Sequence, residues 1–410
     1  MDLLTYLNNP FFGTLYILGK TFVWWGPFVT VYLAWGLYMA YIHARYISRV
    51  PRVLLEIKMP KEIFKSPQAM EVVLSTMYQT TKGNLIEEYI KGKLRSWFSL
   101  EIVSFGGDVH FYIWTERKLK NAIESTIYSQ YPGVEVYEVD DYTNKVPYGL
   151  PGSDWDFWGV EWKFSKEDFY PIKTYVDYGL DKDPKEEFKV DPLTAVLEYM
   201  ASIGPGEQVW YQLIIMASYA RYHKPGTLFK KEDWTARGKR EVDKMMHRES
   251  KTTDLGTAFT KTILSPGEKN TVEAIERSFT KLGFDTGFRC FYLFPKGQDI
   301  LKATRIPHLL SSIKQYGSGN LNSFKLGPWT DFDYPWQDWG GRRLKLLKWR
   351  FFDNYRRRSY FNLPANKKPL VLNTEEIATM FHFPGQVATT PTLERVSSKR
   401  GEPPPNLPVG

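Results

Sequence analysis

The chain has 410 residues, enough for about two or three domains, and its 43% hydrophobic and 24% charged residues are typical of a protein with a buried core. The net charge is only +8, and the single cysteine excludes an internal disulfide or a cysteine-based zinc site. That cysteine, Cys290, lies in an apolar run, which indicates a buried structural thiol rather than a nucleophile.

The first expected element is a membrane-spanning helix. From Thr21 to Ile42 the sequence reads TFVWWGPFVTVYLAWGLYMAYI and carries no formal charge. A spanning helix needs roughly 20 such residues, and its Trp and Tyr side chains suit the boundary between lipid and water. We therefore predict that residues 1–52 form a membrane anchor with its span at about 21–43. Residues 3–18 could extend this helix, lie in the interface or form a second short segment.

The distribution of basic residues predicts the orientation of this anchor. Arg45, Arg49 and Arg52 follow the span, whereas Lys20 alone precedes it. The positive-inside rule then predicts a single-pass protein of the cytoplasmic (inner) membrane, with the bulk of the chain in the cytoplasm. A buried core helix and a cleaved signal peptide are the alternatives, although the positive n-region of a signal peptide is missing.

Residues 53–146 have the pattern of a first α+β unit. Ser66-Pro67 suits the start of a helix, and Gly106-Gly107-Asp108 is a hairpin signal. Alternating apolar residues predict strands at 53–59, 97–105, 109–115 and 134–139, and helical spacing predicts helices after 66 and at 119–131. This order is that of the ferredoxin-like unit, in which two helices cover an antiparallel sheet.

Residues 147–330 follow a similar order and predict a second α+β unit with a charged insertion at 224–254. Expected strands lie at 158–164, 171–176, 208–217, 288–294 and 322–326, and expected helices at 191–203, after 265 and at 306–316. The whole pattern predicts an α+β fold: a transmembrane helix, two ferredoxin-like α/β-sandwich units with antiparallel sheets, and a disordered, Pro-rich linker at 386–410.

The sequence offers no pattern of an active site. Gly19-Lys20-Thr21 resembles the end of a phosphate loop, but Thr14 stands where its first glycine is required. No two of the six histidines lie three to five residues apart, the spacing of paired metal ligands. We therefore expect no catalytic residue, no metal site, no cofactor and no ATP hydrolysis, and the chain is predicted not to be an enzyme.

The segment at 331–385 contains the strongest cluster of basic residues, in which cations alternate with Trp, Phe and Leu. Such a pattern suits contacts with the phosphates of nucleic acid or of anionic lipids. A docked element with a solvated basic edge is the alternative. The candidate polyanion-binding residues are Arg342, Arg343, Lys345, Lys348, Arg350, Arg356, Arg357 and Arg358.

A capped helix is predicted near the end of this segment. Residues 370–385 read LVLNTEEIATMFHFPG, in which Thr374 is expected to cap a helix that Pro384-Gly385 terminates. With the TPTLERVSSKRGEPPPNLP that follows, this motif resembles the junction that precedes the motor in TraG-like and HerA/FtsK-like ATPases of conjugative type IV secretion. The motif residues are Asn373, Thr374, Glu375, Glu376, His382, Phe383 and Pro384.

The resemblance implies a role in DNA translocation, but no motor follows the linker here. It implies a non-catalytic, membrane-anchored component or N-terminal region of a type IV secretion-like machine, which acts as a scaffold and docks a cytoplasmic ATPase. The motor is either a separate chain or is lost by truncation. The implied partners are membrane lipid, a separate ATPase subunit, DNA and further copies of the chain. A membrane-surface scaffold or sensor unrelated to DNA is the alternative.

Overall fold

The computed structural model describes residues 10–60, 65–149, 153–181, 190–227, 230–246, 264–332, 334–384 and 395–396. The chain divides into two compact units. The first comprises Met1–Pro51 and Thr81–Leu94, and the second comprises Arg52–Thr80 and Arg95–Gly410.

The first unit contains the long helix α2 (Pro10–Arg49) and the short helix α4 (Leu85–Tyr89). Asn84 caps α4, because its side-chain oxygen accepts a hydrogen bond from the backbone N–H of Glu87 at 2.8 Å. The two helices are joined by the hydroxyl of Tyr38, which donates to the carbonyl of Tyr89 at 3.0 Å.

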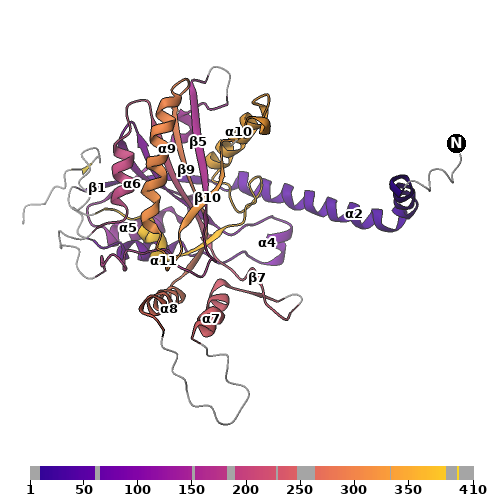
Figure 1. Ribbon diagram of the computed structural model, residues 1–410, viewed down its shortest axis with the longest axis horizontal. Helices are drawn as coiled ribbons and strands as arrows, with labels where there is room; N and C mark the ends of the chain where they lie inside the picture. Colours follow the sequence, from indigo (N-terminus) through magenta and orange to yellow (C-terminus); the bar gives the residue numbers. More distant parts are fainter. Residues whose placement is uncertain are drawn as a thin grey trace, which may run out of the picture. The chain divides into compact units, whose positions relative to one another are not determined.

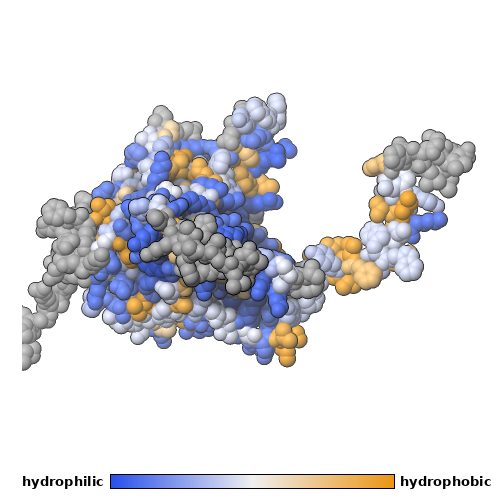
Figure 2. All heavy atoms as spheres, turned by 60° about the horizontal axis from the view of Figure 1, so that its bottom comes forward, coloured by the Kyte–Doolittle hydropathy of each residue, from blue (hydrophilic) through white to orange (hydrophobic). Residues whose placement is uncertain are grey.

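The predicted transmembrane helix is wrong. Within the described ranges, no helix is both long enough and apolar enough to cross a bilayer. The helix itself forms as α2, but Trp, Tyr, Gly and Pro repeatedly interrupt its Val, Leu and Phe residues. Figure 2 shows the interrupting residues as pale spheres among orange ones. Trp and Tyr favour the interface over the hydrocarbon interior. The predicted single-pass membrane location rested on this span and is wrong with it.

The second unit is built on one large antiparallel sheet. In the described part of the chain this sheet has ten strands. Eight follow the order β10-β5-β9-β6-β2-β3-β1-β12, while β11 pairs with β9 and β4 with β1; only β1 and β12 run parallel. The strands are β1 (Arg52–Pro60), β2 (Trp97–Phe105), β3 (Asp108–Glu116), β4 (Glu135–Val139), β5 (Trp155–Phe164), β6 (Gln208–Ala217), β9 (Gly283–Pro295), β10 (Phe324–Trp329), β11 (Leu370–Asn373) and β12 (Arg395–Val396).

The fold is α+β, but the two expected sheets are a single sheet. Strand β2 of the first predicted unit pairs along its whole length with β6 of the second, from Trp97–Met216 to Phe105–Gln208. Nearly all residues of both strands are buried, so neither is a solvated edge. An apolar edge strand with unpaired backbone groups is unstable in water, and joining the sheets removes two such edges.

Residues 171–176, predicted as a strand, form an irregular segment instead. Side chains replace the hydrogen bonds that a neighbouring strand would make. The N–H of Ile172 donates to Oε1 of Glu376 at 2.8 Å, and the N–H of Tyr175 donates to the hydroxyl of Thr379 at 2.9 Å. Burial of this segment therefore depends on helix α11, which is distant in sequence.

Helices cover one face of the sheet and build the main core. They are α3 (Gln68–Thr76), α5 (Lys120–Gln130), α6 (Thr194–Ala201), α9 (Asp299–Ile313) and α11 (Thr374–Met380). Figure 1 shows α6 and α9 on one side of the sheet and α10 (Arg342–Arg356) on the other. Cys290 lies in the core with its thiol fully buried.

The charged insertion carries α7 (Trp234–Met245), which packs against α8 (Pro266–Phe279) beside the small hairpin of β7 (Tyr222–His223) and β8 (Lys231–Glu232). Ser265 opens α8 with a reciprocal capping box to Glu268. Residues 228–229 and 247–254 of the insertion lie outside the described residues. So does the predicted linker at 386–410, apart from β12.

Candidate nucleic-acid interface

An aromatic layer attaches helix α10 to the face of the sheet opposite the main core. Phe351, Phe352 and Tyr355 of the helix are buried. The ring of Tyr355 lies 4.6 Å from that of Phe291 and 5.1 Å from that of Trp210, both on central strands. These buried rings fix the orientation of the helix, so its opposite side faces outward.

A row of polar residues crosses the same face of the sheet. Neighbouring strands place these residues directly opposite one another, in the order Glu56, Tyr112, Glu101, Gln212, Arg289 and Glu161. Gln212 donates to Glu101 at 2.7 Å and accepts from Nε of Arg289 at 2.7 Å. Buried polar groups are tolerated when they are paired in this way.

Arg358 joins the end of α10 to this row. Its side chain is 1% exposed, and its Nε and Nη2 each donate to Glu101 at 3.0 Å. It also donates to Asp141, and its backbone has a left-handed φ of 49°. Burial opposes the guanidinium charge, but the two carboxylates outweigh it and hold the pKa of Arg358 well above its usual range. The last of the predicted polyanion-binding residues is therefore an internal ion-pair partner.

The start of α10 is fixed by local contacts. Gly341 precedes the helix with a φ of 66°, a conformation that glycine adopts without strain. Oδ2 of Asp338 accepts a hydrogen bond from the backbone N–H of Leu344 at 2.7 Å, and this bond lowers the pKa of Asp338. Lys348, in the middle of the helix, is buried and donates to Asp156 at 2.7 Å.

The structure separates the eight predicted polyanion-binding residues into three groups. Lys348 and Arg358 are buried in ion pairs. Arg356 and Arg357 are exposed, and both pair with Asp353 on the same helix. The remaining four project from the exposed side of the first turns of α10: Arg342, Arg343, Lys345 and Arg350.

Exposed aromatic rings accompany these four cations. Trp349 is 49% exposed on the helix, and Trp339 is 90% exposed in the loop before it. In that loop, the rings of Tyr334 and Trp336 are also exposed and stack on each other at 4.4 Å. We call the four cations, Trp349 and these three loop rings the α10 surface. Sequence reasoning missed the loop rings, although their density in YPWQDW was a signal.

The motif at 370–384 lies elsewhere, inside the main core. Its motif residues are all buried. Asn373, rather than Thr374, caps α11, and it forms a reciprocal capping box with Glu376. The cap is shifted because Leu370–Asn373 is strand β11, paired with β9. The hydroxyl of Thr374 donates instead to Glu71 of α3 at 3.1 Å.

Further contacts of the motif connect distant parts of the second unit. Oε1 of Glu375 accepts from the hydroxyl of Thr174 at 2.5 Å and lies 3.2 Å from Nε of Arg277. Nε2 of His382 lies 3.0 Å from Asp191. The ring of Phe383 packs 4.8 Å from that of Tyr131. The motif therefore fastens the loop after β5, helix α8 and the approach to α6 onto the core, and none of its side chains is open to a ligand.

No group of histidine, cysteine or acidic side chains in the described ranges could hold a metal ion. A protein-family model, described as a domain of unknown function (DUF8128), matches residues 47–394. The match includes the α10 surface, the motif at 370–384 and every strand of the sheet except β12. No curated protein matches the chain.

Proposed function

The chain belongs to the family defined by the domain of unknown function DUF8128, and we propose that it is a non-catalytic scaffold that binds single-stranded DNA. In this proposal the α10 surface holds the strand within a type IV secretion-like translocation assembly, and a separate ATPase moves it. The observation that carries the proposal is the outward face of α10, where four cations and exposed rings stand on a rigidly docked helix.

The chemistry of the α10 surface favours a single strand over a duplex. Cations on a fixed helix release counterions when they bind phosphates, whatever the base sequence. Exposed rings add stacking with unpaired bases, worth about 1–3 kcal/mol per base. In a duplex the bases stack on each other, so the rings gain nothing. Trp349 and Trp339 are exposed enough to stack, whereas Phe351 and Phe352 are buried and cannot.

The resemblance of the 370–385 motif to the junction of conjugative ATPases supports the assembly context. In this proposal the buried motif closes the core of the scaffold domain, beside which the motor works. Docking of an ATPase is the part of the proposal that rests on this resemblance alone.

The proposal is tested by replacing Arg342, Arg343, Lys345 and Arg350 together with alanine. Binding of a fluorescent single-stranded 20-mer and of the matching duplex is measured by anisotropy at two salt concentrations. The wild type is expected to prefer the single strand. The slope of log affinity against log salt should be about 3 less negative in the variant, since each lost phosphate contact contributes about 0.7 to it on a single strand.

The matched control removes four lysines from other exposed positions: Lys163, Lys239, Lys269 and Lys325. It loses the same net charge and is expected to keep most of the affinity. Equal losses of DNA affinity in the two variants would mean that net charge alone causes the effect, and would refute the proposal. Absence of DNA binding, with binding of the wild type to phosphatidylglycerol vesicles, would refute it as well and assign the surface to lipid headgroups.

A further inference from the structure

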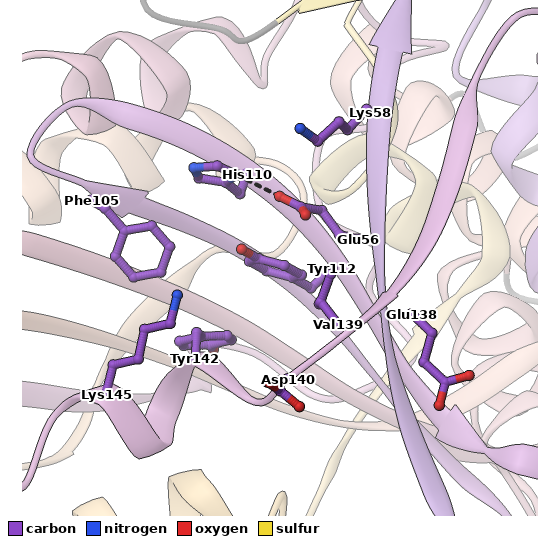
Figure 3. A pocket seen from close by; sticks show the side chains of 10 residues that line it. All are labelled: Glu56, Lys58, Phe105, His110, Tyr112, Glu138, Val139, Asp140, Tyr142 and Lys145. Atoms are coloured by element: carbon purple, nitrogen blue, oxygen red, sulfur yellow. Dashed lines mark hydrogen bonds and ion pairs between the residues drawn. The ribbon is translucent and has the colours of Figure 1, made fainter.

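A cleft of about 800 Å³ opens beside β1 and β3, on the side of the sheet that carries α10 (Figure 3). Its lining comes from β1, the β2–β3 hairpin, the end of β4 and the 3-10 turn at Tyr142–Lys145. None of its lining residues belongs to the α10 surface. Its volume is within the range of small-molecule sites, about 300–1,000 Å³.

Positively charged and proton-donating groups surround the centre of the cleft. Nδ1 of His110 lies 2.7 Å from Oε1 of Glu56, so Nε2 is turned away from that carboxylate. Figure 3 shows the ammonium group of Lys58 directed toward the His110 ring and that of Lys145 between the rings of Phe105 and Tyr142. The His110 hydrogen bond lowers the pKa of Glu56 against the effect of burial, and both lysine charges add to the shift. Both lysines therefore act on the same small volume.

The other carboxylates of the lining do not neutralise this centre. Glu138 is paired with Arg117 and, at 2.8 Å, with Lys120. In Figure 3 it lies away from His110, and Asp140 also points away from His110 and Lys145. Glu56 is occupied by His110. Lys145 is thus left to face an anion, and Nε2 of His110 donates to one when the ring is protonated.

Aromatic rings form the floor of the cleft. The ring of Phe105 lies 5.4 Å from that of His110, and the ring of Tyr112 stacks 5.2 Å from that of Tyr142. Two buried hydrogen bonds fix the ring of Tyr142: its hydroxyl donates to Glu101 at 2.8 Å and lies 2.8 Å from the hydroxyl of Tyr355. The floor is therefore rigid before any ligand enters, which lowers the entropic cost of binding.

We propose that this cleft is a nucleotide site. The phosphate lies between Nε2 of His110 and Lys145, and the base packs against the partly exposed ring of Phe105. The ligand class is a nucleoside monophosphate, either free or as the phosphorylated end of a strand. The site goes beyond the proposed function, since the α10 surface binds the body of a strand without it.

The test is calorimetric titration of the full chain with AMP, adenosine and inorganic phosphate. AMP is expected to bind at one site and more tightly than either of its parts. Lys145→Ala and His110→Ala should each weaken AMP by at least tenfold. Lys118→Ala removes an exposed lysine outside the cleft and should change nothing. Lys145→Arg keeps the charge and should retain most of the affinity. Because Lys145 is exposed, its replacement leaves the fold intact, which urea unfolding checks.

Two further measurements separate the ligand sources and the two proposals. The affinities of a 5′-phosphorylated oligonucleotide and of its unphosphorylated form are compared in the wild type and in Lys145→Ala. A greater loss for the phosphorylated form assigns the site to strand ends. Equal losses or none, when the wild type binds AMP, assign it to free nucleotide. The alanine variant of the four α10 cations should bind AMP normally. No saturable AMP binding at millimolar concentration, or AMP binding indifferent to both Lys145→Ala and His110→Ala, would overturn the inference while leaving DNA binding at α10 unaffected.

Discussion

Replacing Arg358 with alanine should destabilise the second unit by about 3–5 kcal/mol, the usual result of removing one partner from a buried ion pair. Arg358 is the cation between Glu101 and Asp141, and Glu101 is itself fully buried. Without it, the Glu101 carboxylate keeps its neutral donors Gln212, Ser99 and Tyr142 but loses its counter-ion. Urea unfolding followed by tryptophan fluorescence measures the loss.

The neighbouring Arg357→Ala is the matched control. Arg357 is exposed and pairs with Asp353 within the same helix, so its removal should cost no more than about 0.5 kcal/mol. The double variant Arg358→Ala with Glu101→Gln should be more stable than Arg358→Ala alone, because it removes the unpaired charge. A cost of Arg358→Ala as small as that of Arg357→Ala would show that the buried ion pair does not stabilise the unit.

The second large effect is expected at Glu376. Its carboxylate accepts the backbone N–H groups of Ile172 and Asn373, each at 2.8 Å, in the interior of the protein. Each buried donor left without a partner costs about 1–3 kcal/mol, so loss of both in Glu376→Ala should destabilise the unit by about 2–6 kcal/mol. Glu276→Ala, at an exposed position of α8, is the control and should be nearly neutral. Similar unfolding midpoints for the two variants would refute this role of the capping box.

Glu376 should also make stability depend on pH. Burial raises its pKa to about 8, from an ordinary value of 4.5, despite the two backbone hydrogen bonds, and the charges of Glu375 and Asp168 add to the shift. The folded chain therefore keeps a proton that the unfolded chain releases near pH 4.5. The contribution of protonated Glu376 to the free energy of unfolding is complete below pH 4.5. It is lost as the pH rises to about 8, and the loss is on the order of 4 kcal/mol.

The measurement is the free energy of unfolding between pH 5 and pH 8 for the wild type and Glu376→Gln. Burial also raises the pKa of Glu375 and of Asp285, so part of the slope should persist in the variant. The difference between the two curves isolates Glu376. Parallel curves would mean that Glu376 does not titrate in this range in the folded protein.

Neighbouring residues were enough to predict several of the local elements. Gly106 and Gly107 predicted the β2–β3 hairpin, and both have positive φ values, 61° and 107°, which glycine adopts most easily. Ser265-Pro266 predicted the start of α8, where Ser265 caps the helix. These signals depend only on neighbouring residues and on backbone conformation, so one segment of sequence contains all the information needed to read them.

The surfaces that those elements share depend on contacts between segments that are distant in the chain. Strand β2 could not reveal that its second neighbour is β6, because a buried apolar strand suits any partner strand. The run of cations at 342–358 looked uniform, yet contacts with Asp156, Glu101 and Asp141 bury two of them. The acidic start of α11 resembled an ordinary helix cap, but long-range packing buried it. Charge and periodicity describe an element, whereas burial depends on partners that lie far away in the chain.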